Sequence, residues 1–158
     1  MTPIRRLDHV AVVVRDTEAA LATYRDRFGL RVAHTEDLRS PRIRLTYLDC
    51  GNAFLQLIEP LDPDSQLARW LAEHGEGLHH VAFGVEDAVA AAAALAAEGA
   101  PPPTEGQGRG RVSAFVPGEP AHGAVVECTD FVYEEDVEGS PGWLAPSSDT
   151  RVVTERTR

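Results

Sequence analysis

The sequence is poor in cysteine, with Cys50 and Cys128 as the only two among its 158 residues. Two widely separated cysteines form neither the disulfide framework of a small secreted domain nor a Cys-x-x-Cys site. Both lie in strand-like runs, so we expect two buried free thiols. A disulfide scaffold and a cysteine-ligated metal site are therefore excluded.

Long apolar runs are also missing, and no stretch approaches the ~20 residues that a membrane-spanning helix needs. The N-terminal segment MTPIRRLDHVAVVV has two arginines before an apolar run. That run contains Asp8 and His9 and lacks a small-residue cleavage site, so we expect no signal peptide and a cytoplasmic location. A membrane partner is not expected either.

Positive charge is in short supply, because 15 basic residues face 25 acidic ones and the formal net charge is −10. This balance argues against nucleic acid or an anionic membrane as the main partner. A small anionic substrate is compatible with it, since local arginines can outweigh the global charge. The 43% of hydrophobic residues and the length predict one compact domain, or two small units that share a core.

An internal repeat is present. LDHVAVVVRDTEAALATY (7–24) and LHHVAFGVEDAVAAAAAL (78–95) align without a gap at an offset of 71. In each copy an apolar strand leads into an Asp that can cap a helix, and each helix is followed by a glycine, Gly29 or Gly99. The offset aligns Leu7 with Leu78, His9 with His80, Val10 with Val81 and Asp16 with Asp87.

Further strand-like runs follow each repeat, so the pattern β-α-β-β-β is expected twice. These runs cover residues 42–50, 53–60, 111–117 and 123–130. Gly51-Asn52 is a hairpin turn signal. We expect a first module at 1–60 and a second at 77–130, which together make one domain.

The remaining segments are expected to connect or follow these modules. Residues 61–76 predict a linker helix, with apolar residues such as Trp70 at helical spacing. The sequence PPPTEGQGRG (101–110) predicts a flexible loop, and residues 131–158 predict a loosely ordered polar tail.

The second copy contains two adjacent histidines, His79 and His80. They cannot have the same role, because neighbouring strand residues point to opposite faces. His80 is the counterpart of His9 and shares a face with Ala82 and Gly84, whose small side chains leave space. His79 is the counterpart of Asp8 and shares a bulky face that is expected to pack on helices.

The same offset relates two polar residues in the last strand of each half, Gln56 and Glu127. A polar side chain in the middle of a buried strand is costly without a partner. Each lies 47 residues after its histidine, so His9 with Gln56 and His80 with Glu127 predict two half-sites of one metal centre. A structural polar network is the alternative reading.

Two imidazoles and two oxygen donors suit a borderline divalent ion such as Co, Zn, Ni or Mn. Four protein ligands leave two water positions on an octahedral ion. Two oxygens of a substrate can take those positions, which is the geometry for stabilising an enolate.

The paired modules resemble the vicinal oxygen chelate superfamily, which includes glyoxalases, bleomycin-resistance proteins and extradiol dioxygenases. Within it the methylmalonyl-CoA epimerase family is the best match, over residues 6–130 and most specifically in GEGLHH. The resemblance implies an α+β fold whose eight strands form an open, barrel-like cleft around one divalent metal. It carries metal ligation onto His9, Gln56, His80 and Glu127.

The implied activity is that of an isomerase acting on an acyl-CoA, by proton exchange next to the thioester carbonyl. Such enzymes use two glutamates, and Glu127 corresponds to the metal-ligating one. The second is expected just before the third strand, where Ser40 or Pro41 falls by alignment. Glu36 or Asp37 is then the carboxylate available to reach in from the preceding loop.

Arginines near the third strand are candidates for substrate binding. Arg39 and Arg42, with Ser40 between them, could pair with a carboxylate or phosphate. Arg109 and Arg111 occupy the matching place in the second half. A solvated charged edge that discourages strand pairing explains both groups equally well.

Three other functions stay open at this point. They are a vicinal oxygen chelate enzyme of a specialised pathway (an isomerase or lyase), a glyoxalase I-like enzyme, and a non-catalytic small-molecule binding or resistance protein. The resemblance implies a homodimer.

Overall fold

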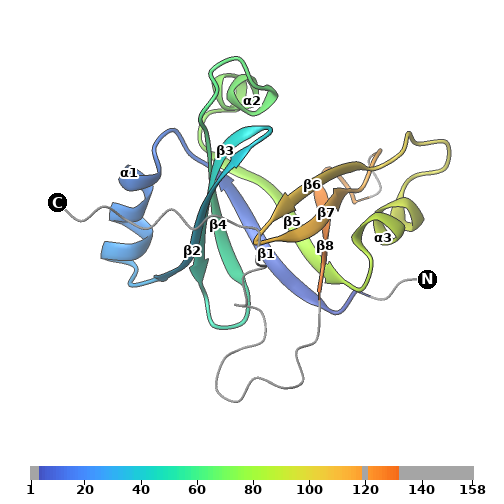
Figure 1. The fold of residues 1–158 in the computed structure, drawn as a ribbon, viewed down its shortest axis with the longest axis horizontal. Coiled ribbons are helices and arrows are strands. Elements are labelled where there is room, and N and C mark those ends of the chain that lie inside the picture. The colour runs from blue at the N-terminus through green and yellow to red at the C-terminus, as the bar shows by residue number, and fades with distance from the viewer. Residues whose placement is uncertain (1–3, 119–120, 132–158) are drawn as a thin grey trace. The chain divides into compact units, whose positions relative to one another are not determined.

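The computed structural model describes residues 4–118 and 121–131 (Figure 1). Of the expected tail at 131–158, only Phe131 lies within the described residues. Eight strands are described: β1 (Arg6–Val13), β2 (Arg31–Arg39), β3 (Arg42–Asp49), β4 (Phe54–Pro60), β5 (Gly77–Val85), β6 (Thr104–Gly108), β7 (Arg111–Phe115) and β8 (Val126–Asp130). The helices are α1 (Thr17–Leu21), continued by the wider π-helical turn η1 (Ala22–Arg27), α2 (Gln66–His74) and α3 (Ala88–Leu95).

The described chain divides into two compact units. The first comprises Val10–His79 and is called the β2–β4 unit. The second comprises the described residues up to His9 and those from His80 onward, and is called the β6–β8 unit. The division falls within β1, directly after His9, and within β5, directly before His80.

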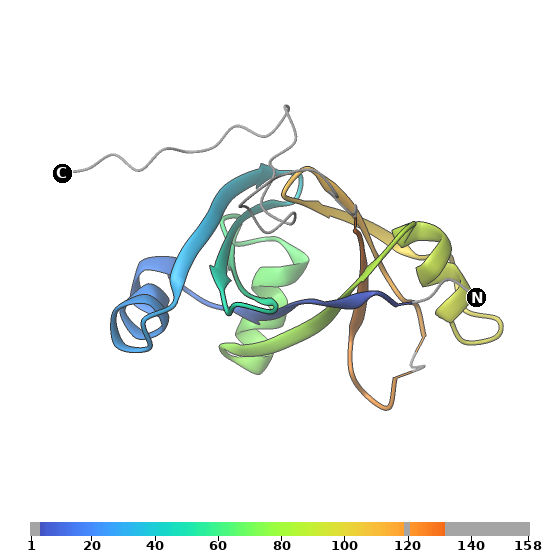
Figure 2. The same cartoon turned by 90° about the horizontal axis from the view of Figure 1, so that it is seen from below.

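The β2–β4 unit is an antiparallel sheet with a helix on one face. Its strands are hydrogen-bonded in the order β2-β3-β4-β1, and the Val14 amide donates to the Ile58 carbonyl at 2.9 Å. Asp16 caps α1 by accepting from the Ala19 amide at 2.7 Å, as the sequence predicts. Helix α1 lies beside the sheet of this unit (Figures 1 and 2). Leu21 of α1 packs against Leu48 and Leu57, so this face of the sheet is buried by apolar contact.

Helix α2 lies within the range predicted for the linker. Ser65 caps it by accepting from the Ala68 amide at 3.1 Å. The Trp70 ring contacts the ring of His79 edge-on, with 5.0 Å between centroids. The expectation that His79 packs on a helix is therefore confirmed.

The β6–β8 unit has the strand order β5-β8-β7-β6, with β5 and β8 parallel. Helix α3 packs on β7 and β8 (Figure 1). Asp87 caps α3 by accepting from the Ala90 amide at 2.9 Å. The buried alanines Ala88, Ala91 and Ala92 pack with Cys128, because small side chains let the helix approach the strands closely.

The predicted loop at 101–110 is wrong at residues 104–108, which form strand β6. This strand pairs with β7 in a hairpin whose register sets Gly106 opposite Ser113. Backbone hydrogen bonds hold an edge strand in place, so β6 needs no apolar pattern. Because it is rich in glycine, its sequence lacks the alternation of apolar and polar residues by which a strand is predicted.

The expectation of two buried thiols is half wrong. Cys128 is buried, whereas Cys50 is exposed beside the turn between β3 and β4. In that turn Gly51 adopts a φ of 86°, and the Cys50 amide donates to the Ala53 carbonyl at 3.0 Å. A tight hairpin places its end residues in solvent whatever their polarity.

None of the helices in the described ranges is long and apolar enough to cross a membrane.

The two thiols should differ in reactivity. Burial, with a smaller contribution from the charge of Glu127, raises the pKa of Cys128 to about 11. Since the thiolate is the nucleophile, Cys128 is almost entirely protonated at about pH 8. We expect an alkylating reagent to label Cys50 in the native protein and both cysteines after denaturation, as read by mass spectrometry. Native labelling of Cys128 at a comparable rate would contradict the burial.

Candidate metal centre

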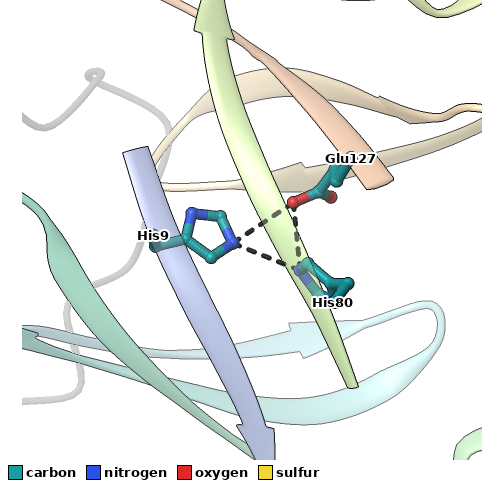
Figure 3. A group of neighbouring side chains, drawn as sticks. All are labelled: His9, His80 and Glu127. Carbon is teal, nitrogen blue, oxygen red and sulfur yellow. Dashed lines mark hydrogen bonds and ion pairs between the residues drawn. The ribbon is translucent and has the colours of Figure 1, made fainter. Parts of the chain in front are cut away.

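Three side chains from three different strands converge in the β6–β8 unit. His9 comes from β1, His80 from β5 and Glu127 from β8 (Figure 3). The parallel register of β5 and β8 sets Glu127 opposite Ala82, two residues after His80, so both side chains lie on one face. The structure thus brings together the predicted pair of His80 and Glu127, with His9 of the other predicted pair beside it.

The three donor atoms form a nearly equilateral triangle. His9 Nε2, His80 Nε2 and Glu127 Oε2 are each 3.2 Å from the other two. Zinc lies about 2.0–2.2 Å from such nitrogen and oxygen donors, which sets neighbouring ligands roughly 3.0 Å apart in octahedral and 3.4 Å apart in tetrahedral coordination. The observed separations fit a common divalent ion. Two neutral imidazoles and one carboxylate are also a donor set that such ions accept.

Asp8 fixes the tautomer of His9. The Nδ1 of His9 donates to Asp8 Oδ2 at 2.8 Å, which leaves the lone pair on Nε2 for the centre of the triangle. The guanidinium of Arg109 donates to the same carboxylate oxygen. A carboxylate behind a ligating histidine is a common second partner in metal sites.

The sequence predicts neither supporting residue in this role. It aligns Asp8 with His79, and it makes Arg109 a candidate for substrate binding or for a solvated charged edge. Arg109 is instead buried, in the turn between β6 and β7, where its φ of 54° turns the chain between two glycines. Its position between Gly108 and Gly110 is a local signal that could have drawn attention to it.

Charge compensation dominates the protonation of this site. Burial would raise the pKa of Asp8, but the hydrogen bond from His9 and the charge of Arg109 together hold it below its ordinary value. Burial likewise opposes the shift at Glu127, whose pKa is nevertheless strongly lowered by its two histidine partners. Burial would lower the pKa of His9, yet Asp8 and Glu127 raise it. The carboxylates are therefore ionised and able to bind a cation.

The ring of His80 is held from the side by Phe115 of β7. The two rings meet edge-to-face, with 5.1 Å between centroids and an interplanar angle of 88°. Gly106 of β6 lies close by, and a Cβ there would stand 2.8 Å from Ser113 Oγ and 3.7 Å from Glu127 Oε1. A side chain at position 106 would therefore collide with Ser113 and crowd the second oxygen of Glu127.

Gln56 lies on β4 and belongs to the β2–β4 unit. Its Nε2 donates to the Tyr47 hydroxyl at 2.6 Å. Its Oε1 is buried and makes no hydrogen bond among the described residues. The phenol thus orients the amide with its carbonyl oxygen available, which suits a metal ligand. Gln56 and the three donors belong to different units, so its ligation stays a prediction.

The predicted substrate-binding residues lie at the turn between β2 and β3. Arg39 and Arg42 are paired across the ends of these strands, and both are exposed, as is Ser40 between them. Their role likewise stays a prediction.

The Glyoxalase/Bleomycin resistance protein/Dioxygenase superfamily model matches residues 8–115, from Asp8 behind His9 to Phe115 beside His80. The chain belongs to this superfamily. Its α+β fold of two β-α-β-β-β modules is therefore the vicinal oxygen chelate fold that the sequence predicted.

Superfamily members of known structure and name are similar to much of the chain. An ethylmalonyl-CoA/methylmalonyl-CoA epimerase from Cereibacter sphaeroides is 33% identical over 137 residues, which cover 86% of this chain and 93% of that protein. A variant of Streptomyces coelicolor methylmalonyl-CoA epimerase in complex with 2-nitronate-propionyl-CoA has a TM-score of 0.70 at 33% identity, covering 81% and 95%. The Mycobacterium tuberculosis methylmalonyl-CoA epimerase also has a TM-score of 0.70, at 26% identity, covering 84% and 92%.

Other relatives match over less of their length. An uncharacterized Bacillus subtilis protein, YqjC, is 35% identical over 80 residues, which cover 51% of this chain and 57% of that protein. The mitochondrial methylmalonyl-CoA epimerase of mouse is 36% identical over 87 residues, and the match spans about half of its length, 49%.

The two adjacent histidines give a direct test of the superfamily site. His80→Ala removes one of three donors and should weaken Co²⁺ or Zn²⁺ binding by at least about 100-fold, since loss of an outer partner alone costs 10–100-fold. His79→Ala removes a ring that contacts Trp70 and none of the three donors, so it should leave the metal affinity unchanged. Isothermal titration with the metal-free protein measures both. Equal loss, or no loss, in the two variants would show that the repeat was misread.

Proposed function

We propose that this chain is a metal-dependent epimerase of a carboxyacyl-CoA thioester, with methylmalonyl-CoA as the reference substrate. The observation that carries the proposal is the group of His9, His80 and Glu127, which fits a divalent ion. The named relatives support the substrate class, because epimerases of methylmalonyl-CoA and ethylmalonyl-CoA are similar to this chain over most of its length. One of the similar structures is a complex with methylmalonyl-CoA.

His9, His80 and Glu127 would hold the ion, and the repeat adds Gln56 as the fourth ligand. When bound, a divalent ion supplies a Lewis acid that stabilises negative charge on substrate oxygens. Cobalt, zinc, nickel and manganese all suit the donor set. Asp8, backed by Arg109, keeps His9 in the tautomer that ligates.

Glu127 is the proposed base on one face of the substrate. Its Oε2 is directed at both histidines, and its Oε1 would lie 3.7 Å from a Cβ at Gly106. It is ionised, as a base must be, and in the proposed reaction it accepts the proton from the carbon between the thioester and the carboxylate. The electron pair of the broken C–H bond moves onto the thioester oxygen, and an enolate results.

Substrate binding by Arg39, Ser40 and Arg42 belongs to the same proposal. All three are exposed at one turn, and the two guanidinium groups are suited to the phosphates or the carboxylate of an acyl-CoA. The homodimer and the cytoplasmic location stay predictions of the sequence.

Hydrogen–deuterium exchange at the substrate tests this function. In deuterated water the cobalt-loaded protein should incorporate deuterium at the central carbon of methylmalonyl-CoA and racemise it, as followed by NMR and chiral analysis. A chelator should abolish both, because the enolate loses its stabilising cation. Glu127→Gln should slow exchange by at least about 100-fold, the usual contribution of a general base.

Glu105→Gln is the matched control, since Glu105 is an exposed carboxylate on β6 and its loss should leave the rate unchanged. Absence of exchange by the metal-loaded wild-type protein would rule out the proposed activity on this substrate.

A further inference from the structure

Each donor of the metal group has a neighbour on the hairpin of β6 and β7, within the β6–β8 unit. The Phe115 ring packs edge-to-face on His80, and a Cβ at Gly106 would stand 3.7 Å from Glu127 Oε1. These two neighbours have no polar side chain, so they shape the surroundings of their donors without orienting them by a side-chain hydrogen bond. His9 is reached differently, through polar contacts that begin at the turn of the hairpin.

The backbone of this turn does not favour an arginine. Arg109 and Gly110 are its two central residues, because the register pairs Gly108 with Arg111. Both central residues have a positive φ, of 54° and 66°, as a type I′ turn requires. Glycine and asparagine are the usual residues at the first of these positions, since the Cβ of other residues is crowded in the left-handed conformation. The reason for an arginine therefore lies in its side chain.

The side chain of Arg109 is buried and paired. Its residue is 6% exposed, although Gln107 and Gly110 on either side of it are exposed. The guanidinium donates to Oδ2 of Asp8, a residue with no exposed surface. Charged side chains are rarely buried unless they are paired. The contact ties the turn to β1, at a residue 101 positions earlier in the chain.

One oxygen of Asp8 links the turn to the metal group. Its Oδ2 accepts hydrogen bonds from both Arg109 and His9 Nδ1, the latter at 2.8 Å. Its Oδ1 is buried and accepts no hydrogen bond from any described residue. The orientation of this carboxylate therefore depends on the two donors that share Oδ2, and removal of the guanidinium leaves the ring of His9 as the other one.

Two effects of the guanidinium on metal binding oppose each other. Its positive charge repels a divalent cation, so Coulomb's law alone predicts tighter metal binding once Arg109 is removed. Its hydrogen bond holds Asp8 against His9, so the loss of this support predicts weaker binding. The second effect prevails, because the adjoining carboxylate compensates the charge, whereas the hydrogen bond acts directly on the group that orients the ligand.

We propose that Arg109 is a positioning residue of the metal centre, and that it couples binding of the ion to the conformation of the β6–β7 turn in which Arg109 contacts Asp8. We call this conformation the closed turn. The inference rests on the metal binding that the proposed function requires. Coupling between two equilibria is reciprocal, so the ion stabilises the closed turn by the same factor by which the closed turn strengthens metal binding.

Arg109→Gly removes the side chain and gives the turn the residue that its backbone prefers. The variant should bind Co²⁺ about 10-fold more weakly than the wild type in isothermal titration. This value is the lower end of the range for outer partners of metal ligands, because Arg109 acts through Asp8. A role in the turn alone predicts no loss of affinity, since glycine suits a positive φ better than arginine. Arg109→Lys keeps a charged donor and should retain most of the affinity.

Arg111→Gln is the matched control, because Arg111 lies two residues later in the same hairpin. Its Nη1 donates to the Asp130 carbonyl at 3.3 Å. The substitution removes one positive charge from the hairpin, as Arg109→Gly does, and should leave the Co²⁺ affinity unchanged. Equal weakening in the two variants would show a general effect of the hairpin or of its charge, and would overturn the specific role of Arg109.

Amide hydrogen exchange measures the coupling without any turnover. In the wild type, saturating Zn²⁺ should slow exchange of the amides of residues 108–111 about 10-fold, as followed by NMR, because coupling is reciprocal. In Arg109→Gly the metal should no longer slow exchange at these amides. The amides of α3, in the same unit, serve as the internal reference, and their exchange should respond to the metal equally in both proteins.

Every outcome bears on the proposal. Weaker Co²⁺ binding by Arg109→Gly alone, with loss of the metal effect on the turn, supports it. Unchanged or tighter binding by Arg109→Gly overturns it, and tighter binding is the result that charge repulsion alone predicts. Weaker binding with an undiminished metal effect on the turn overturns the coupling. If Arg109→Gly does not fold, Arg109→Gln is read by the same criteria.

Failure of this inference is distinguishable from failure of the proposed function. A wild-type protein that binds Co²⁺ but exchanges no proton of methylmalonyl-CoA refutes the proposed function, and the metal affinities of the Arg109 variants still decide the inference. A wild-type protein that binds neither Co²⁺ nor Zn²⁺ overturns both.

Discussion

The carboxylate of Glu127, shared by two imidazoles, is the interaction on which the candidate site depends. It joins β8 to β1 and β5 at a point where each strand contributes a buried polar side chain. An anion in such a place is stable only if positive charge or hydrogen bonds surround it. His9 and His80 provide that compensation from the protein, and a divalent ion would provide it from outside. The same convergence of donors therefore serves both the folded chain and the proposed chemistry.

Behind His9 the charges alternate in sign. Arg109 donates to Asp8, Asp8 accepts from His9, and His9 faces Glu127. Each group stabilises the charged or correctly protonated form of the next, so the chain of contacts acts as one unit. The turn between β6 and β7 thereby gains a role in the site, although none of its residues lies in the donor triangle.

Three of the four residues predicted as ligands lie together in the structure, and the sequence points to them because they obey the repeat. Strands β1 and β5 have strong apolar patterns, and an offset of 71 fixes which histidine corresponds to which. Strand β6 escaped prediction because a glycine-rich edge strand is held by its backbone. Asp8 and Arg109 escaped for a different reason: their contact joins residues 101 apart, and no local pattern encodes it. Alternation along a strand placed Asp8 away from His9, yet its short side chain bonds the neighbouring ring.

The hydroxyl of Tyr47 can form a hydrogen bond with either a glutamine or a glutamate at position 56, which an amide or carboxylate in its place would not do as readily. A phenol both accepts and donates a hydrogen bond. It accepts from the amide of Gln56 here, and by rotating its proton it would donate equally well to a glutamate at the same place. Glutamine and glutamate have nearly the same shape. Exchanging one for the other at position 56 therefore changes the charge of the β4 side chain by one unit without moving a heavy atom. A single hydroxyl proton thus makes the electrostatics of this strand adjustable in evolution while its packing stays the same.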